Sequence, residues 1–306
     1  MDKQSLKMIV SGSTGLVGRA VVKYFRNAGA QVQGLVRPDS QPSNDSNIIC
    51  WDVKEKQMDF KALECMDAII HLAGANIADK RWTEESKKEI LASRVEGTKF
   101  LCESLLTVKN KPKVLFCASA VGFYGYNAPQ SDINEASAVG NDFLANVCDE
   151  WEKATLPLQQ AGVRVVNMRF GMVLSSNGGA LAKMLPIFQL GLGGKLGSGK
   201  QHMSWIHVNE IPRIIAYLID KPEIVGPVNF VSPGAVTNAE FTKALGKVIH
   251  RPTIFPVPAA GIKLLFGEMG ESLLLNGVKV VPQKLLDSGY KFQYPEIEPA
   301  LRACFV

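Results

Sequence analysis

The stretch that most constrains the fold is Lys7–Gly18, which reads KMIVSGSTGLVG. A short apolar run, Met8–Val10, is followed by three glycines at every third position and then by an amphipathic segment. This layout is typical of a strand, a tight turn and a helix whose N-terminus binds a pyrophosphate. Glycine permits the turn, the approach of the backbone to phosphate and close packing of the helix on the sheet. The stretch favours dinucleotide binding, and a glycine-rich turn without a ligand is the alternative.

The chain after this turn alternates between segments with strand and helix patterns. Such alternation predicts a doubly wound, mainly parallel sheet of the Rossmann type, with the ligand at the carboxyl ends of the strands. The expected strands of this half are Gln31–Val36, Ile48–Val53, 66–74, Val114–Ala118 and Val163–Phe170, the expected helices are Arg19–Gly29, Thr83–Leu106 and Gly140–Gln160, and a polar loop is expected over Asp39–Asn47.

The second half is less regular and indicates a smaller lobe. We expect a dinucleotide-binding domain over 1–175 with return elements at 204–232, and a substrate-side lobe built from 176–203 and 233–306. The glycine- and lysine-rich stretch Gly191–Lys200 has the composition of a mobile surface loop, and Lys195 and Lys200 are alternative receivers of an anionic substrate. The expected elements of this half are Ala180–Leu190, Ser204–Val208, Glu210–Ile219, Val228–Val231 and Ala239–Ile249, with a helical unit from Ala259 onward.

The composition of the chain limits the classes of partner that it can bind and the compartment in which it works. Of 306 residues, charged ones of both signs are scattered and leave a net charge of +5, without the basic run that nucleic-acid binding needs. Six cysteines form no CxxC pair, which favours a reducing compartment, and four histidines show no metal-ligand spacing. The polar start and the lack of a membrane-length apolar run predict a cytoplasmic protein without signal peptide or membrane partner. Nothing indicates the oligomeric state.

The residue after the second strand bears on the choice of cofactor. Proteins that prefer NAD place an acidic residue there to bind the ribose 2′-hydroxyl. This chain has Arg37, followed by Pro38. A guanidinium suits a 2′-phosphate, so the sequence favours NADP(H). A solvent-facing arginine at a strand end is the alternative.

Several motifs together resemble the extended and atypical short-chain dehydrogenases/reductases. They are GSTGLVG at 12–18, HLAG at 71–74, ASAVGFYG at 118–125 and SWIHVNEI at 204–211. More narrowly, the chain resembles epimerase-family proteins of unknown substrate that carry an extra C-terminal helical domain. That likeness rests on RFGMVLS at 169–175, GLGGKLGSGKQHMSWIH at 191–207, TNAEF at 237–241 and VVPQKLLDSGYKFQYPEIEPAL at 280–301.

The resemblance implies NADP(H) contacts in several places along the chain. The turn would hold the pyrophosphate, the end of the second strand the 2′-phosphate, and the turn after the fourth strand the ribose. The long helix would also contact the cofactor, and a residue that follows the sixth strand would touch the nicotinamide side. The implied residues are, in that order, Gly12, Thr14, Gly15, Leu16 and Val17; Val36 and Arg37; Leu72, Ala73 and Gly74; and Glu89, Arg94 and Val173. For Glu89 and Arg94 a solvated helix face is the alternative.

The chain departs from the resembled family where protons are transferred. The general family uses a Tyr-x-x-x-Lys pair, in which the lysine lowers the pKa of the tyrosine. Here these positions fall at Leu144 and Cys148. Ser119 and Tyr124 are candidates for polarising a carbonyl, with a structural role as the alternative. Nucleotide-sugar epimerases also place an arginine before the SWIHV strand, and here that place falls near Met203, with Lys200 and His202 close by.

Two functions remain open from the sequence. The first is an NADP(H)-dependent oxidoreductase or epimerase that acts on an unknown small molecule, because hydride transfer is the cofactor's own chemistry. The second is a non-catalytic, NADP-sensing regulatory or interaction protein, which the missing Tyr/Lys pair would fit.

Overall fold

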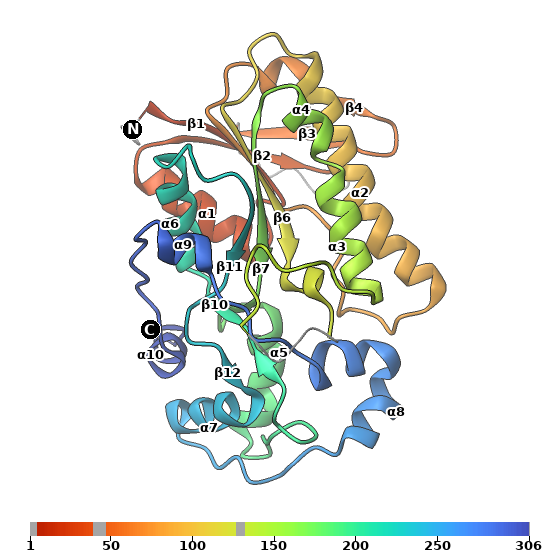
Figure 1. The fold of residues 1–306 in the computed structure, drawn as a ribbon, viewed down its shortest axis with the longest axis vertical. Coiled ribbons are helices and arrows are strands. Elements are labelled where there is room, and N and C mark those ends of the chain that lie inside the picture. The colour runs from red at the N-terminus through yellow and green to blue at the C-terminus, as the bar shows by residue number, and fades with distance from the viewer. Residues whose placement is uncertain (1–4, 39–46, 127–131, 306) are drawn as a thin grey trace.

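The structure is a computed structural model that describes residues 5–38, 47–126 and 132–305. One sheet has the strand order β11-β7-β6-β5-β1-β2-β3-β4 (Figure 1), and its pairs are parallel except for β3 with β4. Strands β2, β3 and β4 follow one another on one side of β1, and β5, β6, β7 and β11 follow one another on its other side. The topological switch point therefore lies between β1 and β5. The strands are β1 (Lys7–Ser11), β2 (Gln31–Val36), β3 (Ile48–Asp52), β4 (Gln57–Met58), β5 (Ala68–His71), β6 (Val114–Ala120), β7 (Arg164–Phe170) and β11 (Gly226–Phe230).

Helices cover both faces of this sheet, which confirms the doubly wound fold. On one face, α1 (Leu16–Asn27) and α6 (Glu210–Ile219) bury residues such as Phe25 and Ile214 against the strands. On the other, α2 (Glu84–Thr107), α3 (Phe143–Lys153) and α4 (Leu156–Gln160) bury residues such as Leu101 and Trp151. Strands that are apolar on both faces are what a parallel sheet covered on both sides requires.

The long helix begins where the sequence predicts. Thr83 is its N-cap, and its hydroxyl accepts a hydrogen bond from the backbone of Ser86, whose hydroxyl accepts one from the backbone of Thr83. The single helix expected over Gly140–Gln160 is wrong, because the chain forms α3 and α4 with a break between them. Pro157 lies in the first turn of α4 and has no N–H with which to continue the ladder of α3. The polar loop expected at 39–47 falls, except for Asn47, outside the described residues.

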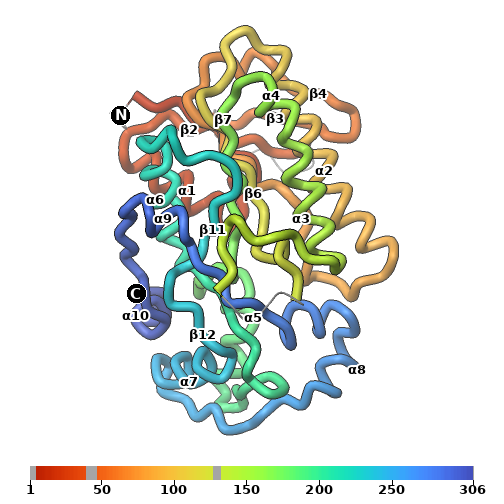
Figure 2. Tube along the Cα trace, in the orientation of Figure 1, coloured from red at the N-terminus to blue at the C-terminus, as the bar shows by residue number. Residues whose placement is uncertain are grey.

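Elements of the second half of the chain lie beyond the carboxyl ends of β6 and β7 (Figure 2), and they enclose a second core. Its buried side chains include Trp205, Phe241 and Leu301. The elements in this half are β8 (Met172–Leu174), α5 (Gly179–Gln189), β9 (His202–Met203), β10 (Trp205–His207), β12 (Val236–Thr237), α7 (Asn238–Ile249), α8 (Ala259–Gly270), a short π-helix (Glu271–Leu275), α9 (Gln283–Asp287) and α10 (Ile297–Ala303).

The stretch Gly191–Lys200 is fixed to its neighbours rather than standing free. The backbone N–H of Gly197 donates to Val257 O, the N–H of Val257 donates to Lys195 O, and both N···O distances are 2.9 Å. Leu196 N–H donates to Asn238 Oδ1 at 2.8 Å. The structure therefore differs from the expected mobile loop, because hydrogen bonds to residues far along the chain hold it.

Strand β11 forms one edge of the sheet and pairs only with β7 among the described strands. Near its end, the backbone N–H of Asn229 donates to Glu135 Oε1 at 3.0 Å, and Asn229 Nδ2 donates to Val281 O at 2.9 Å. Groups from two distant segments thus accept from the backbone N–H and the side-chain amide of Asn229.

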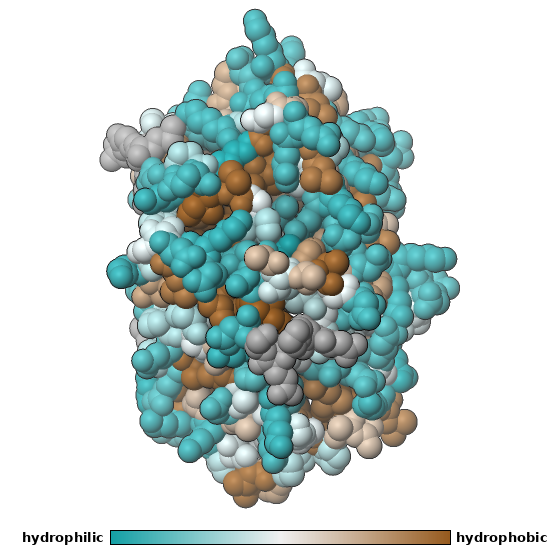
Figure 3. Space-filling view, viewed as in Figure 1, coloured by the Kyte–Doolittle hydropathy of each residue, from teal (hydrophilic) through white to brown (hydrophobic). Residues whose placement is uncertain are grey.

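The surface is mostly hydrophilic on the face shown in Figure 3, with hydrophobic residues in several small patches. In the described part of the chain, no helix combines the length and the apolar content that crossing a bilayer would require.

Candidate functional site

The glycine turn after β1 forms a close backbone cradle. Gly12 has φ +65°, and Gly15 N–H donates to Gly12 O at 3.0 Å. A Cβ at Gly18 would lie 2.1 Å from Gly12 O, so α1 packs on the turn at a distance that only glycine allows. Helix α1 begins after Gly15 without a side-chain cap and without an acidic residue in its first turn. Its N-terminus therefore presents uncapped N–H groups, which suit an anion.

Ser11, the last residue of β1, fixes the segment after β5 beside this turn. Its hydroxyl accepts hydrogen bonds from the N–H groups of Leu72 (3.0 Å) and Ala73 (3.2 Å), which leaves its own hydrogen for His71 Nδ1 (2.7 Å). His71 Nε2 then donates to Thr98 Oγ1 at 3.1 Å. The sequence does not predict this network, because nothing in the local pattern marks Ser11 or Thr98.

His71 should make stability depend on pH. Burial lowers its pKa to about 4, whereas an unfolded histidine titrates near 6.5. As the pH falls from 6.5 to 4, the unfolded chain takes up a proton that the folded chain does not. We therefore expect the free energy of unfolding to fall by about 2–3 kcal/mol over this range on account of His71.

Urea unfolding at several pH values between 7 and 4 measures this effect. A His71→Asn variant should show a shallower loss than the wild type. The control is His250→Asn, because His250 is exposed and its φ of 55° is one that asparagine tolerates. Equal pH slopes in all three proteins would contradict the assignment.

The end of β2 lies beside the cradle. Ser11 pairs with Leu35 in the β1–β2 register, so the next residues, Val36 and Arg37, reach the level of the turn. Val36 is buried, whereas Arg37 is exposed. The structure thus places a solvent-accessible guanidinium at the carboxyl end of β2.

Helix α2 brings Arg94 to the segment after β5. Its guanidinium donates to Ala75 O and Ile90 O, each at 3.0 Å, and lies 5.1 Å from the ring of Trp151. A Cβ on Gly74 would lie 3.5 Å from Arg94 Cγ. Glu89 is exposed on the same helix, more than a turn before Arg94.

Val173 lies in β8, on a segment that returns to the start of α1. Strand β8 begins two residues after β7 ends, so Val173 stands just past the carboxyl edge of the sheet. A Cβ on Gly179 would lie 3.2 Å from Leu16 Cδ2 and 3.6 Å from Val173 O. The structure therefore brings Leu16 and Val173, which are far apart in sequence, to one place.

Ser119 and Tyr124 belong to a buried polar cluster. Ser119 Oγ donates to Glu152 Oε1 at 2.7 Å, and Tyr124 Oη donates to Asn229 Oδ1 at 2.7 Å. Arg169 connects the Ser119–Glu152 pair to the Tyr124–Asn229 pair. It forms a bidentate ion pair with Glu152 (2.8 and 2.9 Å) and donates to Tyr124 Oη (3.0 Å). Burial raises the pKa of Tyr124. Each hydroxyl thus already has an internal acceptor.

The positions of the missing Tyr/Lys pair are filled by packing contacts. A Cβ on Gly122 would lie 3.3 Å from Leu144 Cβ and 3.7 Å from Cys148 Sγ. Burial raises the pKa of the Cys148 thiol to about 12, so the thiol is protonated at neutral pH. Neither side chain supplies the acid–base function of the pair.

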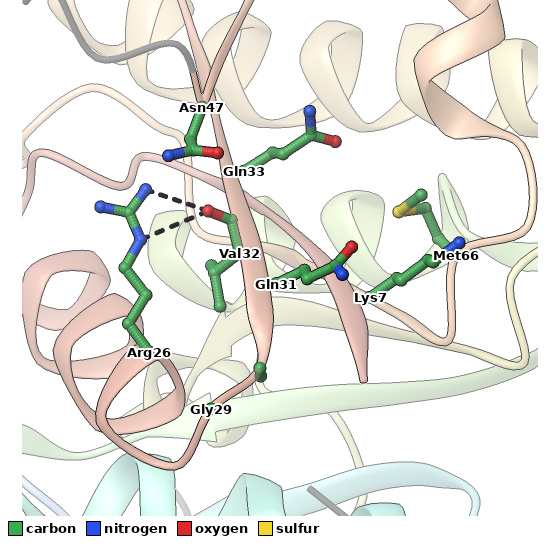
Figure 4. Close-up of a pocket in the computed structure, with 9 residues that line it drawn as sticks. Lys7, Arg26, Gly29, Gln31, Val32, Gln33, Asn47 and Met66 are labelled. Atoms are coloured by element: carbon green, nitrogen blue, oxygen red, sulfur yellow. Dashed lines mark hydrogen bonds between the residues drawn. The ribbon is translucent and has the colours of Figure 1, made fainter. Parts of the chain in front are cut away.

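A cavity of about 500 Å³ lies at the amino ends of the strands, at the end of the sheet opposite to the glycine turn (Figure 4). Lys7 and Gln31, at the amino ends of β1 and β2, line it together with Arg26, whose guanidinium donates twice to Val32 O. Ligands of open α/β sheets bind at the carboxyl ends, so this cavity is distinct from the cradle. No group of three His, Cys, Asp or Glu side chains within the described ranges is arranged to hold a metal ion.

Two family models match the chain: the NAD dependent epimerase/dehydratase family over residues 8–231, and a domain of unknown function (DUF1731) over 257–304. Epimerase family protein Mb2239 of Mycobacterium bovis is 40% identical over 292 residues, which cover 95% of each chain. Epimerase family protein SDR39U1 of Mus musculus is 36% identical, over 97% of this chain and 99% of the mouse protein.

Solved structures agree with this result. Human epimerase family protein SDR39U1 (isoform 2), determined with NADPH, has a TM-score of 0.89 and 32% identity, covering 98% of this chain and 99% of that one. The nucleoside-diphosphate sugar epimerase of Corynebacterium glutamicum has a TM-score of 0.78 and 32% identity, covering 98% of this chain and 58% of that one. These matches confirm the resemblance inferred from the motifs. The chain belongs to the NAD dependent epimerase/dehydratase family and carries a DUF1731 domain over residues 257–304.

Proposed function

We propose that this protein binds NADP(H) in the cradle Gly12–Gly18 and uses it as an oxidoreductase or epimerase on a small molecule. The observation that carries the proposal is the cradle itself. Backbone approaches at Gly12 and Gly18 leave no room for a side chain, and the first turn of α1 is uncapped and free of acidic residues. The NADPH bound to human SDR39U1 supports the same cofactor here.

We propose the other cofactor contacts for residues that lie, like the cradle, at the carboxyl end of the sheet. Thr14, Leu16 and Val17 would continue the pyrophosphate site into α1, and Leu72, Ala73 and Gly74 would line the ribose. Arg94 and Glu89 would contact the cofactor from α2. Val173 would lie on the nicotinamide side. The nicotinamide supplies the hydride chemistry when bound, and the protein positions it.

We assign the phosphorylated cofactor because of Arg37. Its guanidinium is exposed at the carboxyl end of β2, level with the turn, at the position where NAD-preferring proteins carry the acidic residue for the ribose 2′-hydroxyl.

Arg37→Glu should weaken NADPH binding by about 100-fold, because it replaces a charge-assisted hydrogen bond with repulsion of the 2′-phosphate. NADH binding should change by less than about threefold, since NADH lacks that phosphate. Titration of nicotinamide fluorescence measures both. Lys221→Glu makes the same change in net charge on the turn between α6 and β11 and serves as control. Equal losses for NADPH and NADH would refute the assignment.

Ser119 and Tyr124 are our candidates for polarising the substrate. Both lie at the carboxyl end of β6, yet each donates its hydroxyl hydrogen internally, to Glu152 and Asn229. To act on a carbonyl, either hydroxyl has to leave its internal acceptor. Tyr124→Phe should therefore lower kcat while leaving NADPH affinity unchanged.

The non-catalytic alternative rests on Leu144 and Cys148 in place of the Tyr/Lys pair. The comparisons do not favour it, since they place the chain in a family of epimerases and dehydratases. NADPH oxidation against a broad panel of carbonyl compounds separates the two. Tight NADPH binding without turnover of any compound would reverse our choice.

A further inference from the structure

The connector between α7 and α8 runs beside the end of α5, at the end of the molecule that carries α7 (Figures 1 and 2). Arg251 Nε donates to Gln189 O at 2.8 Å. A Cβ on Gly194 would overlap Phe255 O, so the two backbones also touch there. We term the surface of these two segments, residues 187–195 and 251–256, the tip.

Large apolar side chains of the tip are exposed to solvent. Leu190 is 74% exposed and Ile254 is 73% exposed. Single exposed apolar side chains are ordinary, whereas a group of them marks a surface that contacts a partner or a membrane. Figure 3 shows hydrophobic residues at the lower end of the molecule, where this connector runs in Figure 1. The members of the group are Ile187, Leu190, Leu192, Ile254 and Phe255, each more than half exposed.

The chain around the tip supplies cations and no acidic residue. Aspartate and glutamate are absent from 153–209 and from 241–267. Lys195, Lys200 and Lys243 in these stretches are exposed, and none of them forms an ion pair with a carboxylate of the described residues. Their positive charges are therefore not neutralised by neighbouring side chains in that part of the structure.

A pocket of about 220 Å³ brings two of these cations to an apolar side chain. Lys195, Lys243 and Ile254 all line it. Ammonium groups bind phosphate as point charges, so a phosphate with an apolar substituent fits this lining. Glu240, the acidic residue of α7, is held at the N-cap of its own helix, where it accepts from Thr237 Oγ1 at 2.8 Å.

We propose that the tip docks on an anionic phospholipid surface, with the apolar group at the boundary of headgroups and acyl chains and the lysines on headgroup phosphates. The strength of such a contact comes from buried apolar area together with attraction between basic side chains and anionic lipids. A protein partner is the less favourable occupant, because protein interfaces are depleted in lysine.

This proposal differs from the expectation of no membrane partner that the sequence gives. That expectation follows from the lack of a signal peptide and of a membrane-length apolar run, and a peripheral contact requires neither. The proposal is also independent of cofactor binding, so its failure would leave the proposed function untouched.

Flotation of the full chain with lipid vesicles tests the proposal. We expect binding to vesicles of phosphatidylcholine with about 30% phosphatidylserine to be about tenfold stronger than binding to pure phosphatidylcholine vesicles, because the attraction of lysine requires anionic lipid. No binding to the anionic vesicles, or equal binding to both kinds, would overturn the proposal.

Two double variants separate the apolar and the charged contributions. Leu190→Ser with Ile254→Ser, and Lys195→Gln with Lys243→Gln, should each weaken binding to the anionic vesicles by about tenfold. Thermal unfolding followed by circular dichroism shows that each variant is folded. If either double variant binds like the wild type, the contribution assigned to its side chains is absent and the proposal fails.

Matched controls make the same changes at the end of the molecule that carries α4 and β4 (Figure 1). We expect both to bind the anionic vesicles like the wild type, and losses equal to those of the tip variants would contradict docking through the tip. The controls are Phe60→Ser with Leu156→Ser at exposed apolar positions, and Lys54→Gln with Lys61→Gln at exposed lysines.

The oligomeric state tests a second copy of the chain as the occupant of the tip. Sedimentation velocity at rising protein concentration should show the same species for the wild type and for Leu190→Ser with Ile254→Ser. A dimer that is lost in this double variant would assign the tip to self-association and would overturn the proposal.

Discussion

Replacing Glu152 by alanine should lower the free energy of unfolding by about 3–5 kcal/mol, because it leaves the guanidinium of Arg169 buried without its counter-charge. Glu152 accepts two hydrogen bonds from that guanidinium and one from the hydroxyl of Ser119. Arg169 is only 3% exposed, so water cannot replace the lost carboxylate. Urea unfolding monitored by circular dichroism measures the change.

A neighbouring glutamate on α3 provides the control. Glu150 is partly exposed and pairs with Lys153 at 3.0 Å on the surface, so Glu150→Ala should change stability by less than about 1 kcal/mol. If the two variants unfold at the same urea concentration, the buried pair does not stabilise the fold as we argue.

The second large effect concerns the cradle. Gly18→Ala should weaken NADPH binding by about 100-fold or more. The new Cβ would lie 2.1 Å from Gly12 O and 2.8 Å from Ser13 Cα, and both are backbone atoms that move only with the turn. A displaced turn no longer aims its N–H groups at the pyrophosphate. Fluorescence titration with NADPH gives the affinity.

The matched substitution is Gly261→Ala in α8, where the added methyl group meets nothing within 4 Å. It should leave NADPH affinity unchanged and raise stability slightly, because alanine has the higher helix propensity. Gly18→Ala with wild-type affinity would show that the close approach is not required for binding.

The sequence predicts the elements around the cradle because their causes are local. Three glycines at fixed spacing, an apolar strand and an amphipathic helix are visible within the first 30 residues, and Thr83 marks the start of α2 through its own capping contacts. Arg37 is predicted for the same reason, since it directly follows an apolar strand. These features depend on neighbours in the chain, and a single sequence displays them.

The buried cluster around Arg169 has no such local signal. Glu152 and Arg169 come from a helix and a strand, and Tyr124 reaches Asn229, which is 105 residues away. The place of Ser119 and Tyr124 at a strand end predicts them as site candidates, but their hydrogen-bond acceptors cannot be predicted from the sequence. The prediction of a mobile loop at Gly191–Lys200 fails for a related reason. Its composition suggests a free loop, but hydrogen bonds to residues far along the chain hold it in place.

The edge strand β11 has a consequence for how copies of this chain can meet. A strand with open N–H and C=O groups is a template on which another chain can add its own strand. Glu135 already accepts from the backbone N–H of Asn229, so an incoming strand would have to displace that carboxylate there. Self-association by addition of a strand to β11 is therefore disfavoured at Asn229.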